Sequence, residues 1–218
     1  MKLKALALAL LVAAAPAAAS VASHRDPKKR FTPADQAKAK SIVLKPADVG
    51  AGWKRRTISN NGNDDLNCPG FDPDLSDLVE TGEATSPLFY RTDGSSLFSG
   101  ATVYPNERTA VTAWSRVVKP ALVKCLAAKL ERESTPLVTL KTIRSGSLAF
   151  PHVAPRTAAF RLGVEVSGPG VKVNVYSDLV AIGRGRVEAD FIFSSVRNPF
   201  PAAFEQRLAR RVAARLKG

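Results

Sequence analysis

The sequence predicts one α+β domain over residues 32–218, in which a curved antiparallel sheet of about six or seven strands is flanked by helices. Its main support is a region, 160–193, where apolar and polar side chains alternate in three successive stretches. Turns rich in glycine, at 167–170 and 183–185, join these stretches, which is typical of an antiparallel meander. Segments with apolar residues at helical spacing lie on both sides of this region.

The first 22 residues have the composition of a secretory signal peptide: two lysines, an apolar run over residues 5–15 and then a stretch of small residues. The apolar run is shorter than the roughly 20 residues that span a bilayer. The small-x-small rule allows cleavage after Ala19 or after Ala22. We therefore expect a secreted, extracytoplasmic protein that is soluble after removal of residues 1–22 and has no membrane span.

The next segment, 23–31, is polar, basic and interrupted by a proline, which predicts a flexible basic tail. Thr32 then has the position of a helix N-cap, and Pro33 that of the first helical residue. We expect a helix over 33–42, followed by a turn that leads to Trp53 and a short basic strand.

An acidic segment comes next. From residue 64 to residue 83 the chain carries seven acids and no Lys or Arg. The spacing of Asp72, Asp74 and Asp77 lacks the Gly and the final Glu of a calcium loop. We expect a solvated acidic face, or the start of a helix at 74–77.

The middle of the chain predicts two strands and a long helix. The strands are expected at about 86–91 and 96–104. Asn106 then caps a helix over 106–131, in which Pro120 is expected to produce a kink. Further short strands near 136–143 and 147–150 are expected to precede the meander.

Strict alternation predicts that each strand of the meander has one buried and one polar face. On its third strand the residues expected inside are Val187, Ala189, Phe191 and Phe193, and those opposite them are Arg186, Glu188 and Asp190. A last helix, near 200–216, carries an apolar stripe of Phe204, Leu208, Val212 and Leu216.

The chain has two cysteines, Cys68 and Cys125. A single pair in an oxidising compartment is expected to form a disulfide, which here would join the acidic segment to the kinked helix. These cysteines, with His24 and His152, do not make a convincing tetrahedral metal site. We therefore predict a Cys68–Cys125 disulfide and no metal.

The formal net charge of +13 has two interpretations. It favours anionic partners, such as wall polymers or lipid headgroups, although we do not expect nucleic acid; alternatively, it serves solubility alone. A cationic contact surface for anionic material, if the protein has one, is predicted on the last helix at Arg207, Arg210, Arg211 and Arg215. Alternatively, these arginines only solvate the helix and complement its C-terminal dipole.

No assembled catalytic constellation is visible. A Ser-His-acid hydrolase needs a histidine held in a cleft, whereas His152 lies in an expected loop and no Gly-x-Ser-x-Gly motif occurs. The acids are clustered in one loop or spread over strand faces. Gly183 and Gly185 lack the third glycine and the following helix of a phosphate-binding loop. We expect no catalytic residues and no cofactor.

Several segments together resemble one family. The stretch from Leu44 to Trp53 has a Pro-Ala-Asp turn before a Gly-Trp pair. Other matching segments are Ser76–Gly82, a strand ending at Tyr104, a helix with Ala110, the two cysteines and Val180–Arg186. The set is similar to the extracellular sensor domain of PknH-type receptor kinases and to LpqN-like exported proteins of actinobacteria. This resemblance implies a PsbP-like outline with a cleft for an unidentified ligand, and it supplies no catalytic residues. The chain departs from the family in lacking a second disulfide, a kinase segment and a lipid-anchor cysteine.

These observations predict a secreted, non-catalytic, sensor-like protein of the bacterial cell envelope that binds a small molecule or an envelope lipid or glycan. One alternative is a hydrolase of envelope polymers that uses dispersed acids or His152. A cleft with two carboxylates about 5–10 Å apart would favour that alternative, and an apolar or mixed cleft without a titratable pair would favour binding. The other alternative is a polyanion-binding surface protein.

Overall fold

The computed structural model describes residues 25–58, 68 and 70–217, so the predicted signal peptide lies outside the described residues. Five helices occur in this part of the chain: α2 (Pro33–Ile42), α3 (Pro46–Val49), α4 (Glu107–Val117), α5 (Pro120–Arg132) and α6 (Ala202–Arg215). The strands are β1 (Lys28–Lys29), β2 (Lys54–Arg56), β3 (Val79–Glu80), β4 (Gly82–Thr85), β5 (Leu88–Tyr90), β6 (Ser96–Val103), β7 (Thr139–Ser147), β8 (Arg156–Gly168), β9 (Val171–Arg184) and β10 (Val187–Val196).

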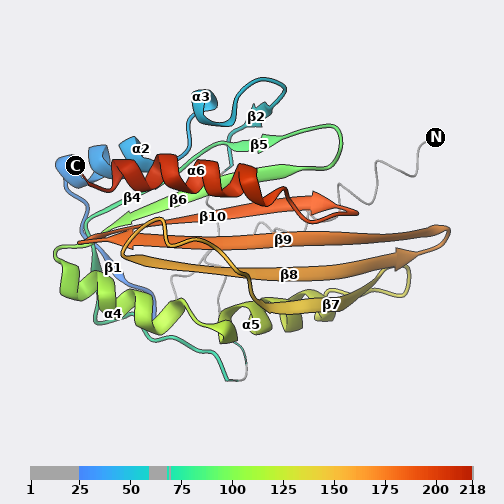
Figure 1. Ribbon diagram of the computed structural model, residues 1–218. Coiled ribbons are helices and arrows are strands. Elements are labelled where there is room, and N and C mark those ends of the chain that lie inside the picture. Colours follow the sequence, from blue (N-terminus) through green and yellow to red (C-terminus); the bar gives the residue numbers. More distant parts are fainter. Residues whose placement is uncertain (1–24, 59–67, 69, 218) are drawn as a thin grey trace.

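An antiparallel sheet of eight strands forms the middle layer, in the order β2-β5-β6-β10-β9-β8-β7, with β4 also paired to β6. The neighbours β8, β9 and β10 follow one another in the chain, so the predicted meander is confirmed. Helices α2, α3 and α6 lie over one face of the sheet, and α4 and α5 lie over the other (Figure 1). The predicted α+β class, an antiparallel sheet flanked by helices, is therefore also confirmed.

The apolar rows of the meander strands point to opposite faces of the sheet. In the register, Phe160 of β8 pairs with Leu179 of β9, which pairs with Ile192 of β10. Directly paired residues share a face, so Phe160 lies on the face opposite to Phe191. Phe191 belongs to the core under α2 and α6, and Phe160 to the core under α5. Each strand has the predicted alternation, but both faces of the sheet are covered.

The core under α6 contains the largest buried side chains. Phe191 and Phe193 of β10 pack there with Ile42 of α2 and Leu208 of α6, all with 0% of their surface exposed. Thr32 caps α2 as predicted, because its hydroxyl accepts a hydrogen bond from the N–H of Asp35 at 3.1 Å. The predicted stripe of the last helix is also buried from Leu208 onward, while Phe204 is half-buried at its start.

The helix predicted over 106–131 is two helices. Residue Lys119 has an extended backbone (φ −139°, ψ 156°), and Pro120 begins α5 instead of bending one continuous helix. A proline disfavours helical geometry in the residue before it and lacks the N–H that a helix interior requires. The predicted kink is therefore a complete break between α4 and α5.

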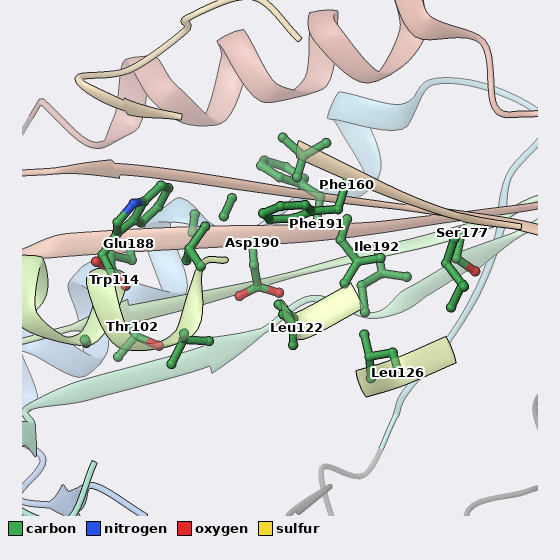
Figure 2. A pocket seen from close by; sticks show the side chains of 18 of the residues that line it. Thr102, Trp114, Leu122, Leu126, Phe160, Ser177, Glu188, Asp190, Phe191 and Ile192 are labelled. Carbon is green, nitrogen blue, oxygen red and sulfur yellow. The ribbon is translucent and has the colours of Figure 1, made fainter. Parts of the chain in front are cut away.

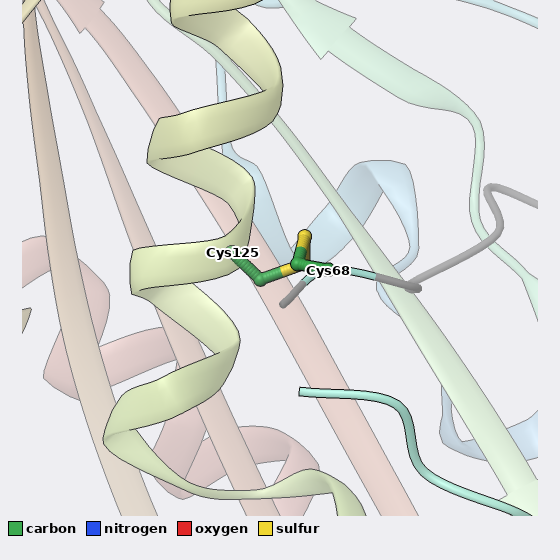
Figure 3. Close-up of a disulfide and its surroundings, with 2 residues drawn as sticks. All are labelled: Cys68 and Cys125. Atoms are coloured by element: carbon green, nitrogen blue, oxygen red, sulfur yellow. A yellow bond between two sulfur atoms is a disulfide. The ribbon is translucent and has the colours of Figure 1, made fainter. Parts of the chain in front are cut away.

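The predicted disulfide is present and joins Cys125 of α5 to Cys68, with a Cα–Cα distance of 5.5 Å (Figure 3). Phe71 is buried beside the two cysteines, and Ala121 and Leu122 pack against them. Because α5 belongs to the layer below the sheet, the disulfide fixes the acidic segment to that layer.

The segment predicted to be a flexible tail, 23–31, is held in place over its described part. Residues 28 and 29 form β1, which pairs in parallel with β3. The ammonium of Lys29 also lies 2.7 Å from the carboxylate of Glu83. Basic and acidic stretches that are separate in the sequence therefore neutralise each other here.

The acidic segment contains no helix at 74–77, so that alternative was wrong. The chain makes a turn there, and the side chain of Asp74 accepts a hydrogen bond from the N–H of Ser76 at 3.0 Å. Asp77 forms an ion pair with Arg116 of α4. The strands predicted near 136–143 and 147–150 are likewise one strand, β7, with a register shift between Thr142 and Arg144.

Candidate functional site

A groove of about 980 Å³ lies between the sheet and the pair of helices α4 and α5 (Figure 2). Its walls come from both helices and its floor from β6, β8, β9 and β10. The break between α4 and α5 lies beside it, since Val117, Val118 and Leu122 are among its lining residues. Pro120, which separates α4 from α5, therefore also shapes the wall of the groove.

The residues on either side of Asp190 on the floor of the groove have small side chains or none. Asp190 of β10 pairs with Gly100 of β6 on one side and with Ala181 of β9 on the other, so the three share one face. A Cβ atom at Gly100 would lie 2.5 Å from a carboxyl oxygen of Asp190. The glycine therefore leaves the space that the Asp190 side chain occupies, and Asp190 is the longest side chain in its row.

The walls of the groove are mainly apolar. Leu122, Leu126 and Leu130 follow one another at intervals of four residues along α5 and form one face of that helix. From the sheet they are met by Phe160, Leu162, Leu179 and Ile192. In Figure 2, Leu122 lies opposite Asp190, and Leu126 lies farther along, near Ser177. An apolar channel therefore runs along α5, away from the acidic residues.

One end of the groove is polar. Glu188 lies there beside Trp114 of α4 (Figure 2), and an oxygen of its carboxyl group is 3.6 Å from the guanidinium of Arg156. That oxygen is buried and has no hydrogen-bond partner. Burial raises the pKa of Glu188 to about 7, against the attraction of Arg156. Glu188 is thus an acid that changes charge near neutral pH at the wall of a large pocket.

Asp190 lies on the floor of the same groove. Its carboxyl group is open to the groove and points toward Leu122, while protein encloses it elsewhere (Figure 2). This enclosure raises the pKa of Asp190, although a backbone hydrogen bond from Gly100 favours the charged form. Among the described residues no basic side chain forms an ion pair with Asp190, in contrast to Glu188.

A second group of charged residues is buried on the opposite face of the sheet. Arg161 of β8 binds Asp178 of β9 through two hydrogen bonds, of 2.6 and 2.5 Å. Glu205, in the first turn of α6, is fully buried beside them, and as a carboxylate it has no hydrogen-bond donor. Burial, and then a hydrogen bond with Asp178, raise the pKa of Glu205 to about 9. A protonated Glu205 can donate to Asp178, so this cluster supports the packing of α6.

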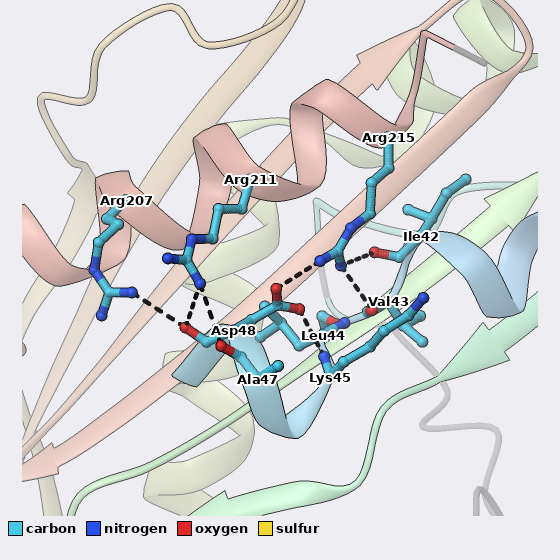
Figure 4. Close-up of polar contacts among 10 residues, drawn as sticks. Ile42, Val43, Leu44, Lys45, Ala47, Asp48, Arg207, Arg211 and Arg215 are labelled. Carbon is cyan, nitrogen blue, oxygen red and sulfur yellow. Dashed lines mark hydrogen bonds and ion pairs between the residues drawn. The ribbon is translucent and has the colours of Figure 1, made fainter. Parts of the chain in front are cut away.

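The arginines predicted as a contact surface for anions mostly bind the chain itself (Figure 4). Arg207 and Arg211 donate to the carbonyl of Asp48, at 3.1 and 3.2 Å. Arg215 donates to the side chain of Asp48 at 2.5 Å and to carbonyls at the end of α2. Arg210 is exposed. Three of the four thus hold the α3 segment against α6, and an anionic contact at this helix stays a prediction.

The sequence resemblance implied a cleft but not its location, and sequence reasoning missed the role of the acids in the groove. Glu188 and Asp190 were expected on the polar side of a strand, and they are, but α4 and α5 cover that side. The signal available was a pair of acids two residues apart, opposite a wholly apolar row. Their partners Gly100 and Ala181 could not be found without the strand register. His152 is exposed and is not among the residues of the groove.

In the described part of the chain, no three His, Cys, Asp or Glu side chains gather as metal ligands would. No helix among the same residues has the length and apolar character needed to cross a membrane.

The fold and the groove define an α+β protein with a large, partly acidic pocket on one face of a helix-flanked antiparallel sheet. No protein-family model matches the chain, and no curated protein matches its sequence.

Among solved structures, the chain is similar to the extracellular domain of PknH from Mycobacterium tuberculosis, with 10% identity and a TM-score of 0.42 over 85% of this chain and 96% of that one. It is also similar to LpqN, a protein involved in cell envelope biogenesis of the same organism, with 11% identity and a TM-score of 0.34 over 80% of this chain and 78% of that one. These are the proteins that the sequence resemblance named. Membership of a common family stays a prediction.

Proposed function

We propose that this chain is a secreted, non-catalytic protein of the cell envelope that binds an apolar or amphipathic small molecule in the groove between the sheet and α4–α5. The groove carries this proposal: its volume of about 980 Å³ lies within the range of small-molecule sites, about 300–1,000 Å³, and its apolar walls enclose a few polar groups. Secretion is supported by the signal-peptide pattern at 1–22 and by the disulfide, which is typical of oxidising compartments.

Binding can be tested with N-phenyl-1-naphthylamine, an uncharged apolar fluorophore. We expect saturable fluorescence enhancement with the natural chain. The variant Ala181→Phe places a large side chain on the floor of the groove and should weaken binding at least tenfold. Ala203→Phe, on the exposed side of α6, is the matched control and should bind as the natural chain does.

Circular dichroism and mass mapping of the disulfide would show that both variants fold. Native mass spectrometry of protein from its producing cells would detect a retained natural ligand and give its mass. Absence of saturable binding, or equal binding by both variants, would contradict the proposal.

A second candidate, an envelope-polymer hydrolase, is favoured by one observation. Glu188 and Asp190 project from the same face of β10 into the groove, and two residues along a strand separate their Cα atoms by about 7 Å. The groove is thus mixed, with apolar walls and a titratable pair. A glycosidase, however, places its two carboxyl groups on opposite sides of the bond, one protonated and one ionised. Here both come from one strand, and both have a raised pKa.

Release of soluble fragments from purified envelope polymers tests this candidate. Turnover by the natural chain that is lost in both Glu188→Gln and Asp190→Asn would support the hydrolase and overturn the non-catalytic proposal. No turnover, with fluorophore binding intact, is the result we expect.

A further inference from the structure

From the charges inside the groove we infer that its occupant is an amphiphile with a cationic, ammonium-type head, held by Asp190 beside Glu188, and with an apolar tail that lies along α5. This inference rests on the proposed function, because it specifies the ligand of the same groove.

The first step concerns charge balance. Glu188 has Arg156 at 3.6 Å, and Arg156 is in turn shared with Glu107 at 3.8 Å. Asp190 has no such cation among the described residues. The polar end of the groove therefore holds two acids within the pocket and one arginine, which is shared with a third acid. Asp190 is exposed to the groove, so a bound ammonium group can reach its carboxylate and supply the counter-charge that no described basic side chain supplies.

The second step concerns space. Gly100 and Ala181 flank Asp190 with almost no side chain, so the carboxyl group can be approached from the groove. In Figure 2 this group lies beside Leu122 of α5, and one of its oxygens lies over Gly100 of β6. Trp114 lines the same groove beside Glu188, and the guanidinium of Arg156 lies over its ring at 5.8 Å, so this ring already binds a cation.

The third step concerns the tail. From Leu122 to Leu130 the helix α5 advances by eight residues, or about 12 Å, and Leu126 lies between them on the same face. Phe160 and Leu162 line the groove from the sheet. This distance accommodates an alkyl chain of medium length, and the charged side chains of Lys129, Arg132 and Glu133 lie at its far end.

The positive net charge of the whole chain opposes binding of a cationic ligand. With a net charge of +13, the protein attracts anions and repels cations at long range. The groove also carries Lys129 and Arg132, which follow Leu126 along α5 toward the end of that helix. A preference for a cationic amphiphile can therefore come only from local contacts at Asp190 and Glu188.

The experiment measures displacement of bound N-phenyl-1-naphthylamine by dodecylamine, dodecanol and dodecanoate, each below its micellar concentration, at pH 7.5 and low salt. We expect dodecylamine to displace the fluorophore at a concentration at least tenfold below that of dodecanoate. In Asp190→Asn the advantage of dodecylamine over dodecanol should disappear, while the fluorophore still binds. Asp93→Asn, in the exposed turn between β5 and β6, is the matched control and should keep the advantage.

A measurement on the natural chain alone keeps the test valid even if the Asp190→Asn variant does not fold. This measurement is the ratio of the concentrations at which dodecylamine and dodecanol displace the fluorophore from the natural chain. If the fluorophore binds but dodecylamine is no better than dodecanol or dodecanoate, the cationic head is refuted and groove binding stands. If the fluorophore does not bind at all, both the proposed function and this inference fail.

Discussion

Replacing Glu205 by glutamine should stabilise the protein, although it alters a fully buried residue of the main core. Glu205, in the first turn of α6, lies beside Asp178 of β9, which is itself paired with Arg161 of β8. In the folded chain Glu205 must keep its proton, whereas the unfolded chain releases it at ordinary acid pKa values. Glutamine is never charged, and its amide can still donate to Asp178, so the variant avoids this cost.

The magnitude follows from linkage between protonation and folding. The pKa of Glu205 is raised from 4.5 to about 9, so between these values the folded state binds one proton more than the unfolded state. Stability must then fall as pH rises, by about 1.4 kcal/mol per pH unit. At pH 7 the natural chain has lost about 3 kcal/mol through this group, and Glu205→Gln should recover most of it.

The assay is urea unfolding of both proteins at pH 5, 6, 7 and 8, with the disulfide intact. The free energy of unfolding should be similar near pH 5 and should diverge in favour of Glu205→Gln as pH rises. Glu133→Gln, at an exposed position, is the control and should run parallel to the natural chain. A Glu205→Gln curve that is parallel to the natural one, or lies below it at pH 8, would refute the reasoning.

Three further changes have expected outcomes. Reduction of the disulfide should lower the free energy of unfolding by about 2–5 kcal/mol, and an unchanged urea midpoint in dithiothreitol would contradict this. Gly82→Ala should destabilise the protein by about 1–3 kcal/mol, because the new Cβ would clash with the backbone oxygen of Asp35 in α2; a thermal midpoint equal to that of the natural chain would show that the helix can shift. Arg215→Ala should cost about 3 kcal/mol at pH 7, since it leaves the buried carboxylate of Asp48 without its partner. Burial works to raise the pKa of Asp48, but hydrogen bonds from Arg215 and from the backbone of Lys45 hold this pKa below its usual value. The cost of Arg215→Ala should therefore shrink as Asp48 becomes protonated in acid. A cost that does not depend on pH would contradict this role.

The elements that local patterns specify were predictable from the sequence. Period-two alternation located β8, β9 and β10, and the caps at Thr32 and Asn106 located the starts of α2 and α4. The effect of Pro120 was underestimated, because a proline preceded by an extended residue starts a new helix more readily than it bends an old one.

What depends on long-range pairing was not predictable. Alternation shows that the two faces of a strand differ, but only the register shows that Phe160 and Phe191 point to opposite sides of the sheet. For the same reason the expected cleft could not be located from the sequence, since Gly100 lies far from Asp190 in the sequence. The arginines of α6 were interpreted from their own helix alone, and nothing in that helix indicates that the carbonyl of Asp48 lies opposite them.

The position of β10 between β9 and β6 determines when the chain can become structured during its synthesis. Strand β6 gains its second neighbour only after residues 187–196 have been made, and the core beside α2 is closed only by α6. A chain interrupted before this point would expose an unpaired strand edge and a row of apolar side chains, the surfaces that drive aggregation. The first half of the sequence is therefore not expected to fold independently, and substitutions that disrupt β10 or α6 should destabilise the whole domain.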